Sequence, residues 1–328
     1  MIKKKIVKLS LPLFKRLIPY RLPRVIAMEA TNRCFLECLT CPVPQQMRRE
    51  KGDMSLLTFK TLLAQINWKV DKMSWAFGGE PLLNKDLWKM VALAKEKGII
   101  SKVDTNGMLI NEYIDEILNS GLEILNIAFE GLSKESTSNF RKGYNYELVM
   151  KNIEFVCRQR RQKKSKTPYI ALNYLVRRDN ENEIQKTMEL ARGWGVDSIT
   201  LKSINISPSC WLTQEFVQDL GEKFLPVERN EFSRYIYKNN KWMPKNELSD
   251  YCRYLFNSVT ITWDGKVLPC CMDFDATLAA GDIFKEGLRN IWQGKTFSQI
   301  RNRVFSNSVA MCKDCTSVSL QKKINLNP

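Results

Sequence analysis

Short apolar runs and longer amphipathic stretches alternate along the first two thirds of the chain. The apolar runs predict strands near residues 25–31, 72–78, 100–105, 123–129, 168–176 and 198–205. Apolar positions at helical spacing predict helices near residues 55–67, 86–98, 111–120, 144–162 and 180–194. Strands that alternate with helices favour parallel β-α units with right-handed crossovers. Six such units do not complete the usual eight, so we expect an α/β protein with an open (β/α)6 partial barrel.

Polar motifs lie where the predicted strands end. Cys34, Cys38 and Cys41 follow the first strand. Gly78–Pro81 follow the second strand, and Asp104–Gly107 follow the third. Active sites of β-α barrels lie at the carboxyl ends of the strands. We therefore expect these three segments to meet in one site.

The three cysteines occur in the run Cys34-Phe-Leu-Glu-Cys38-Leu-Thr-Cys41. Cysteine thiolates are the usual ligands of iron–sulfur clusters, which normally take four of them. Three thiolates would hold three irons of a four-iron cluster and leave the fourth iron open to another ligand. The motif alone leaves a structural zinc knuckle, or three unrelated thiols, as the alternative.

The Gly78-Gly79-Glu80-Pro81 motif has a chemical meaning of its own. Two glycines let the backbone approach a ligand closely, and Pro81 fixes the turn. Glu80 offers a carboxylate to a cation. Any strand-end turn could have this sequence, but its place one β-α-β step after the cysteines makes it a strong signal.

A second set of cysteines follows residue 250. Cys252 precedes a strand-like run at 258–263, and Asp264-Gly265 predicts a hairpin turn that returns to Cys270 and Cys271. After a helical stretch near 284–303, Cys312 and Cys315 complete the set. Cys252, Cys270, Cys312 and Cys315 make a four-thiolate site, which suits either a zinc ion or a [4Fe–4S] cluster.

The first two motifs resemble those of the radical S-adenosylmethionine (SAM) enzymes, whose signature is Cys-x3-Cys-x2-Cys followed by Gly-Gly-Glu-Pro. The resemblance implies that Cys34, Cys38 and Cys41 ligate a cluster whose open iron binds the amino and carboxylate groups of SAM. It implies that Gly78, Gly79, Glu80 and Pro81 line the methionine ammonium, and it groups Thr105 and Asn106 with them. Thr40 departs from the family pattern, which usually has an aromatic residue before the third cysteine.

A further feature of the family is a Ser-x-Asp-Gly element after the fourth strand, followed by an arginine. This chain has Ala128 and Glu130 at the Ser and Asp positions and keeps Arg141. The resemblance implies that Arg141 contacts the SAM carboxylate or a substrate anion, and the alternative is a surface arginine before a turn. We interpret Asn180 and Glu183 as caps of the following helix.

The second cysteine set resembles the SPASM/twitch extension of radical SAM enzymes. The cysteine order, the Gly281-Asp282-Ile283 turn and Leu288–Trp292 carry this likeness, and the spacing is similar to that of the twitch dehydrogenases acting on 2-deoxy-scyllo-inosamine. It implies one auxiliary [4Fe–4S] cluster, with Cys271 as an alternative ligand to Cys270. The expected organisation is given by four segments: a basic N-terminal extension 1–23, the barrel 24–210, a bridge 211–250 and a small cysteine-rich α+β domain 251–328.

The amino-acid composition limits the kinds of partner and compartment that suit this protein. The net charge of +16 indicates an anionic partner, and residues 1–24 carry many basic and no acidic residues, which suits contact with a membrane surface or a strap on the barrel. No apolar run is long enough to span a membrane, and no signal peptide is evident. Ten cysteines without an export signal favour reduced thiols and a cytoplasmic protein. The absence of histidine excludes histidine bases and histidine metal sites.

We therefore expect a radical SAM oxidoreductase that abstracts hydrogen from a small, anionic substrate and oxidises it with the auxiliary cluster. An external electron donor such as flavodoxin or ferredoxin is implied by the resemblance. An epimerase is the alternative, with Cys210 as hydrogen donor, although a packed thiol is the plainer interpretation of Cys210. An enzyme that modifies a peptide is another alternative to the oxidoreductase. A zinc- or cluster-stabilised nucleic-acid-binding protein is the alternative of a different class, and no nucleic-acid-binding module is recognisable.

Overall fold

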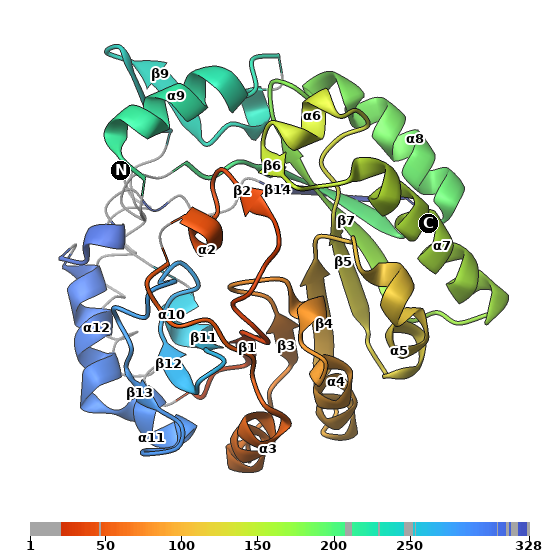
Figure 1. The fold of residues 1–328 in the computed structure, drawn as a ribbon. Coiled ribbons are helices and arrows are strands. Elements are labelled where there is room, and N and C mark those ends of the chain that lie inside the picture. Colours follow the sequence, from red (N-terminus) through yellow and green to blue (C-terminus); the bar gives the residue numbers. More distant parts are fainter. Residues whose placement is uncertain are drawn as a thin grey trace, which may run out of the picture.

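The computed structural model describes residues 21–45, 47–206, 212–228, 230–245, 252, 254–306, 308–312, 315 and 321–326. One large sheet organises them (Figure 1). Its ten strands, in spatial order, are β13 (Gly281–Asp282), β12 (Lys266–Leu268), β11 (Ser258–Ile261), β1 (Val25–Met28), β3 (Lys72–Trp75), β4 (Ile100–Thr105), β5 (Ile124–Ala128), β7 (Tyr169–Val176), β8 (Ser198–Ser203) and β14 (Gln321–Asn325).

The six strands predicted from the apolar runs form the middle of this sheet. Each neighbouring pair from β1 to β8 is parallel, as β-α units require. The helices that connect them are α3 (Leu56–Gln65), α4 (Leu87–Glu96), α5 (Ile114–Asn119), α7 (Tyr146–Gln162) and α8 (Ile184–Trp194). The α/β partial barrel expected from the sequence is therefore confirmed.

Local signals set the helix ends. The Ser55 hydroxyl accepts a hydrogen bond from the Thr58 amide at 3.0 Å and caps α3. Asn145 caps α7 in the same way through the Leu148 amide. Gly195 ends α8 with a left-handed φ of 87°. The helix predicted at 111–120 is divided into a 3-10 turn followed by α5.

The remaining elements lie in the connections and at the carboxyl end. The helices are α2 (Pro42–Gln45), α6 (Glu135–Ser138), α9 (Gln214–Phe224), α10 (Tyr254–Asn257), α11 (Leu288–Gln293) and α12 (Lys295–Phe305). The strands are β2 (Glu37–Cys38), β6 (Arg141–Lys142), β9 (Tyr235–Lys238) and β10 (Lys241–Pro244). Short 3-10 turns span Pro81–Leu83, Ile110–Tyr113, Glu181–Glu183, Asn230–Phe232 and Ala310–Cys312. None of the helices described is long and apolar enough to cross a membrane.

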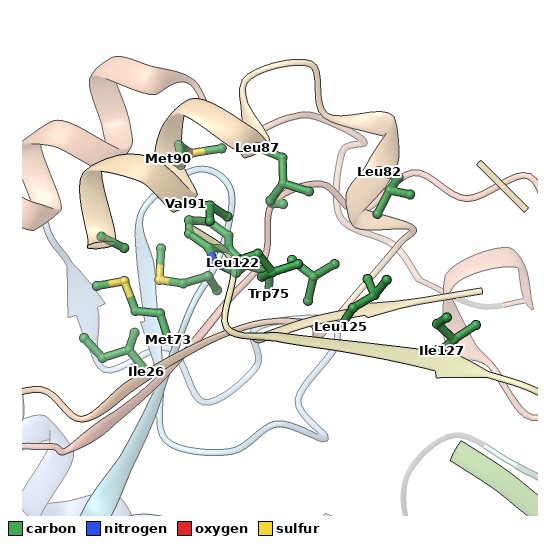
Figure 2. Packing of buried hydrophobic residues seen from close by; sticks show 14 of the residues in the cluster. Ile26, Met73, Trp75, Leu82, Leu87, Met90, Val91, Leu122, Leu125 and Ile127 are labelled. Carbon is green, nitrogen blue, oxygen red and sulfur yellow. The ribbon is translucent and has the colours of Figure 1, made fainter. Parts of the chain in front are cut away.

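The two faces of the barrel strands differ in polarity. Trp75, Val103 and Leu125 are fully buried and belong to the same hydrophobic cluster as Leu87 and Val91 of α4 (Figure 2). Because side chains alternate along a strand, the neighbouring positions point to the opposite, inner face. That face carries polar groups, namely Ser74, Lys102, Asp104, Asn126, Asn173, Thr200 and Lys202. The core therefore lies under the helices, and the inside of the barrel is polar.

The carboxyl-terminal segment adds strands to the barrel sheet, which the sequence pattern did not indicate. β11 pairs in parallel with β1, with Val25 opposite Ser258. β12 then returns antiparallel, which confirms the hairpin turn at Gly265. At the other edge, β14 pairs antiparallel with β8. The predicted domain boundaries stay predictions; residues 1–20, 207–211 and 246–251 lie outside the described residues.

Leu62 and Leu57 of α3 offer a matched test of the core. Leu62 is fully buried, whereas Leu57 is 74% exposed. We expect Leu62→Ala to lower the free energy of unfolding by about 2–5 kcal/mol, because the buried cavity adds to the lost transfer energy. Leu57→Ala should change it by less than about 0.5 kcal/mol. Urea unfolding checks both, and equal effects would contradict this packing.

Candidate functional site

The three cysteines lie on the loop that follows β1, and backbone hydrogen bonds hold this loop. β2 pairs with β6, which places Cys38 opposite Arg141. The Leu39 amide donates to the Phe140 carbonyl at 3.0 Å, and the Cys41 amide donates to the Cys38 carbonyl at 3.1 Å. The cysteine loop is thus fastened to the segment that follows β5.

The thiols of this loop face a partly buried site together. The pKa of Cys34 is raised to about 11, mainly by burial, with smaller contributions from Glu80 and Cys38. Burial likewise raises the pKa of Cys41 to about 12, with contributions from Cys38 and Cys34. Electrostatic interactions therefore link the three thiols. A metal must displace their protons to bind, as it does at any thiolate site.

The spacing of the donor groups bears on which metal fits. In the described ranges, no group of three cysteine, aspartate or glutamate side chains converges on one metal ion. A zinc ion draws its thiolate sulfurs to about 3.8 Å from one another, given Zn–S bonds of about 2.3 Å in a tetrahedron. A four-iron cluster binds each thiolate on a different iron and requires wider spacing.

The Gly78-Gly79 pair packs directly against the cysteine loop. Gly79 has a φ of 66°, and a Cβ there would lie 2.5 Å from the carbonyl oxygens of both Thr31 and Arg33. The next amide, that of Glu80, donates to the Arg33 carbonyl at 2.7 Å. A side chain at Gly79 has no room because its neighbours are backbone atoms. The two glycines therefore let the loop after β3 touch the loop after β1.

Glu80 is a buried carboxylate with a defined set of donors. Its Oε1 accepts hydrogen bonds from the Thr105 hydroxyl at 2.6 Å and the Leu82 amide at 3.2 Å. Its Oε2 accepts one from the Asn106 amide at 2.8 Å. Burial nevertheless raises the pKa of Glu80 to about 7. The Nδ2 of Asn106 is also buried, and it has no hydrogen-bond partner among the described residues.

Arg141 belongs to a buried ion network. It pairs with Glu130, and only 18% of its side chain is exposed, so a surface arginine is the wrong interpretation. Its Nη1 lies 3.9 Å from the Cys38 sulfur. Arg177 binds the other oxygen of Glu130 at 2.8 Å. Although burial opposes ionisation, the two guanidinium groups hold the pKa of Glu130 below its usual value.

Three residues of this network were not foreseen or were misinterpreted. Arg177 carries no local sequence signal, because its partner Glu130 lies in another β-α unit. The Asn180 side chain does not cap the helix; its Nδ2 donates to the Glu130 carbonyl at 2.7 Å. Glu183 accepts from the Leu132 amide at 2.7 Å. Both side chains instead hold the loop that follows β5.

Near the hairpin, electrostatic interactions link the thiols of Cys252, Cys270, Cys271 and Cys315. Burial raises the pKa of Cys252, and the thiols of Cys270 and Cys315 raise it further. Cys271 is hydrogen-bonded to Cys270 and also interacts with Cys252 and Cys315, so both neighbours face the set. The Cys315 amide donates to the Cys312 carbonyl at 3.3 Å. Cys157 is fully buried in α7, and Cys210 lies outside the described residues.

An unpredicted contact joins the two regions. Glu29, at the end of β1, is fully buried and binds the Arg49 guanidinium, with one distance of 3.0 Å. Glu29 also accepts a hydrogen bond from the Trp263 amide at 3.1 Å. The Phe77 and Phe274 rings stack with centroids 5.0 Å apart. The hairpin segment is therefore packed onto the loops that carry both motifs.

Family models match both halves of this arrangement. The family model of the radical SAM superfamily matches residues 28–191, which is half of the chain. The chain belongs to the radical SAM superfamily. The model of SPASM, an iron–sulfur cluster-binding domain, matches residues 252–316. Membership implies a SAM-binding [4Fe–4S] cluster, SAM and auxiliary iron–sulfur clusters as cofactors.

Curated relatives align over most of the chain. A tungsten-containing aldehyde ferredoxin oxidoreductase cofactor-modifying protein of Pyrococcus furiosus is 24% identical over 89% of this chain and 87% of its own length. A Saccharolobus islandicus protein described as "Probable GTP 3',8-cyclase" is 25% identical over 79% of this chain and 86% of its own.

Two solved structures share the fold of the chain. BtrN in complex with AdoMet and 2-DOIA has a TM-score of 0.57 at 19% identity, covering 91% of this chain and 94% of BtrN. Streptococcus suis SuiB bound to its precursor peptide SuiA has a TM-score of 0.65 at 15% identity, covering 95% of this chain and 75% of SuiB. These similarities support the partial barrel with its SPASM extension.

The chain's own groups fit these cofactors. The cysteine loop presents three thiols, the number that leaves one iron of a four-iron cluster open. Glu80 supplies a buried carboxylate for an ammonium, and the Asn106 Nδ2 supplies a donor that lacks a partner. A bound ligand with an acceptor atom at this point would satisfy that donor.

Gly79 and Gly98 form a matched pair that tests the packing of the cysteine loop. Both have positive φ, but a Cβ at Gly98 meets nothing within 4 Å. Gly98→Ala should cost about 1–2 kcal/mol, from the left-handed conformation alone. Gly79→Ala should cost a further 1–3 kcal/mol or so, because it also drives the Cβ into backbone atoms. Equal losses in urea unfolding would show that the contact with the cysteine loop is wrong.

Proposed function

We propose that this protein is a radical SAM oxidoreductase that dehydrogenates a small, anionic substrate. The observation that carries the proposal is the contact between the two motifs: the Gly79 backbone lies against the cysteine loop, and Glu80 is buried next to it. Cys34, Cys38 and Cys41 would hold a four-iron cluster, which would supply the electron for splitting SAM and so allow hydrogen to be abstracted from the substrate.

Each residue of the first site has a defined task in this proposal. Cys34, Cys38 and Cys41 ligate the cluster. Gly78, Gly79, Glu80 and Pro81 surround the methionine ammonium, which Glu80 binds as a carboxylate. Thr105 and Asn106 hold Glu80 in place, as their hydrogen bonds of 2.6 and 2.8 Å support.

Arg141 has a different task, because Glu130 already occupies its guanidinium. Its position beside the Cys38 sulfur supports a role in stabilising the thiolate and orienting the loop. Its Nε is buried and has no hydrogen-bond partner in the part of the chain that the structure describes, which leaves one donor for an anion such as the SAM carboxylate. The contact with that carboxylate expected from the resemblance remains part of the proposal.

In this proposal, the second cysteine set would hold the cluster that completes the oxidation of the substrate. Cys252, Cys270, Cys312 and Cys315 ligate one auxiliary cluster, and Cys271 is the alternative to Cys270. An electron acceptor close to the barrel favours dehydrogenation, because the substrate radical must lose an electron and a proton. An external donor such as flavodoxin or ferredoxin supplies the initial electron. Chemistry with reduced thiolates suits the cytoplasm, since oxidising compartments favour disulfides.

Two other radical SAM activities stay as candidates. The likeness to SuiB, which is bound to its precursor peptide, gives peptide modification some support at the level of the fold. Epimerisation needs a hydrogen donor, for which Cys210 is the candidate. Product mass in heavy water separates dehydrogenation, which removes hydrogen, from epimerisation, which adds one deuterium. The family membership makes a nucleic-acid-binding role the weaker choice.

The net charge of +16 supports an anionic substrate. A relative described as a GTP cyclase acts, by its name, on a phosphorylated compound. The basic residues at 1–24 stay a candidate for peripheral contact with a membrane surface, and positions 1–20 lie outside the described residues.

Cleavage of SAM is the direct test. Anaerobically purified protein should contain about eight irons per chain, as two four-iron clusters require, and should release 5′-deoxyadenosine on reduction. Cys34→Ala should lower the iron to about four per chain and abolish the release. Cys157→Ala, which changes a buried core thiol of α7, should leave the iron content and the release of 5′-deoxyadenosine unchanged. Zinc without iron in the wild type would overturn the proposal.

The pKa of Glu80 predicts how SAM binding depends on pH. A buried carboxyl with a pKa of about 7 is protonated below that pH and cannot bind an ammonium as a carboxylate. SAM affinity should therefore rise between pH 5.5 and 7 by a factor approaching about ten per pH unit, and level off above pH 7. Glu80→Gln should bind SAM weakly and show no such rise. Equilibrium dialysis measures both, and a flat wild-type profile would contradict the role of Glu80.

A further inference from the structure

Arg177 follows β7 directly, and its side chain is fully buried. Its Nη1 binds Glu130 at 2.8 Å, its Nε binds Asp179 at 2.9 Å, and its Nη2 donates to the Ser136 carbonyl. A buried ion network is not required for stability, because apolar residues of similar volume often stabilise a core equally well. The presence of a fully buried arginine at this place therefore needs another explanation.

Glu130 connects Arg177 to the first cysteine site. One oxygen of Glu130 binds Arg177 and the other binds Arg141, and only 1% of the Glu130 side chain is exposed. The Arg141 Nη1 lies 3.9 Å from the Cys38 sulfur, and the pairing of β2 with β6 places Arg141 opposite Cys38. The Arg141 guanidinium thus bridges a buried carboxylate and the sulfur of a cysteine in the motif.

Phe140 gives Arg177 a second contact with the same segment. The Arg177 guanidinium carbon lies 4.6 Å from the centroid of the Phe140 ring, and Phe140 directly precedes Arg141 in the chain. The Phe140 carbonyl accepts a hydrogen bond at 3.0 Å from the amide of Leu39, the residue after Cys38. Arg177 therefore contacts the segment that holds both the cation near the sulfur and the backbone that carries this sulfur.

We propose that Arg177 is a positioning residue, which acts through Glu130 and Phe140 to hold the Arg141 guanidinium near the Cys38 sulfur and thereby raises the reduction potential of the cluster at the first site. The proposal rests on the proposed function, because it requires that this loop holds a four-iron cluster. The potential of such a cluster depends on the charge near it and on hydrogen bonds to its sulfurs. A cation near a ligand sulfur favours the reduced state, since reduction adds one electron.

A redox titration of the complete protein measures this effect without turnover. The full-length, cluster-containing protein is reduced stepwise with dithionite in the presence of redox mediators. Electron paramagnetic resonance follows the reduced clusters, and the signal that Cys34→Ala removes belongs to the first site. The midpoint potential of that signal is then compared between the wild type and the variants.

Replacing either arginine should lower the midpoint potential. In Arg177→Met, Glu130 loses one of its two cations and Arg141 loses its fixed position. At the wild-type midpoint, the ratio of reduced to oxidised cluster should fall about threefold. In Arg141→Met it should fall about tenfold, which corresponds to about 59 mV for one electron. Arg177→Lys keeps a positive charge facing Glu130 and should restore most of the wild-type potential.

Arg141→Lys separates the position of the charge from the charge itself. One ammonium group cannot replace the two guanidinium nitrogens of Arg141 that face Glu130 and Cys38. The ratio of reduced to oxidised cluster should therefore fall about threefold, although the net charge of the protein is unchanged. A wild-type potential in Arg141→Lys would overturn the proposal, because the charge alone would then be sufficient.

Arg160→Met is the matched control for the loss of a buried arginine. Arg160 is 7% exposed and pairs with Asp197, which precedes β8 and lies at the amino ends of the strands. This variant should lower the free energy of unfolding but leave the potential unchanged. An equal shift in Arg160→Met, or an unchanged potential in Arg177→Met, would overturn the role of Arg177.

Two checks keep this result separate from misfolding and from a failure of the proposed function. Circular dichroism shows whether each variant is folded, and if Arg177→Met is not, the potentials of Arg177→Lys and Arg141→Lys decide. A potential below that of the wild type in Arg141→Lys, with most of it kept in Arg177→Lys, supports the proposal. If Cys34→Ala removes no signal, the proposed function fails; if it does and the variants keep the wild-type potential, only the role of Arg177 fails.

Discussion

Burial of the Glu29 carboxylate places strict demands on its surroundings, and much of the molecule is arranged to meet them. A buried charge without a partner costs several kcal/mol, so Glu29 needs Arg49, which also donates to the Phe274 carbonyl at 2.6 Å. Burial still raises the pKa of Glu29 in spite of this partner. The ion pair therefore acts less as a source of stability than as a contact that fixes geometry: Arg49, the Gly78 turn and the hairpin at Trp263 all meet at one carboxylate.

Around this point the site is built from backbone atoms as much as from side chains. The loop after β3 touches the loop after β1 through Gly79, and the β2–β6 pair ties the cysteine loop to the segment after β5. Charged side chains then fill the space between these loops in alternating sign, from Arg141 through Glu130 to Arg177. The loops after β1, β3, β5 and β7 thereby share one rim, on which thiols and a carboxylate can be held.

The sequence predicted the features that depend on local pattern. The six barrel strands were found because each buries one face under helices, and the two cysteine sets were found because their spacing is short. Long-range pairings left no such signal: Val25 and Ser258 lie side by side in the sheet although neither sequence segment indicates the other. The same holds for Arg177 with Glu130 and for Arg49 with Glu29. Asn180 was misinterpreted because an Asn before a helix usually caps it through its Oδ1, and here that oxygen accepts a hydrogen bond from the Arg177 amide at 2.7 Å instead.

The parallel pairing of β11 with β1 has a consequence for how the chain comes to be folded. β1 is synthesised before the other barrel strands, and β11, which covers its outer edge, is synthesised after all of them. Until then the nascent barrel presents an open row of backbone donors and acceptors, the kind of edge to which other chains add. Vectorial synthesis thus exposes this protein to misassembly for most of its translation, and a chain cut before the hairpin would keep that edge permanently.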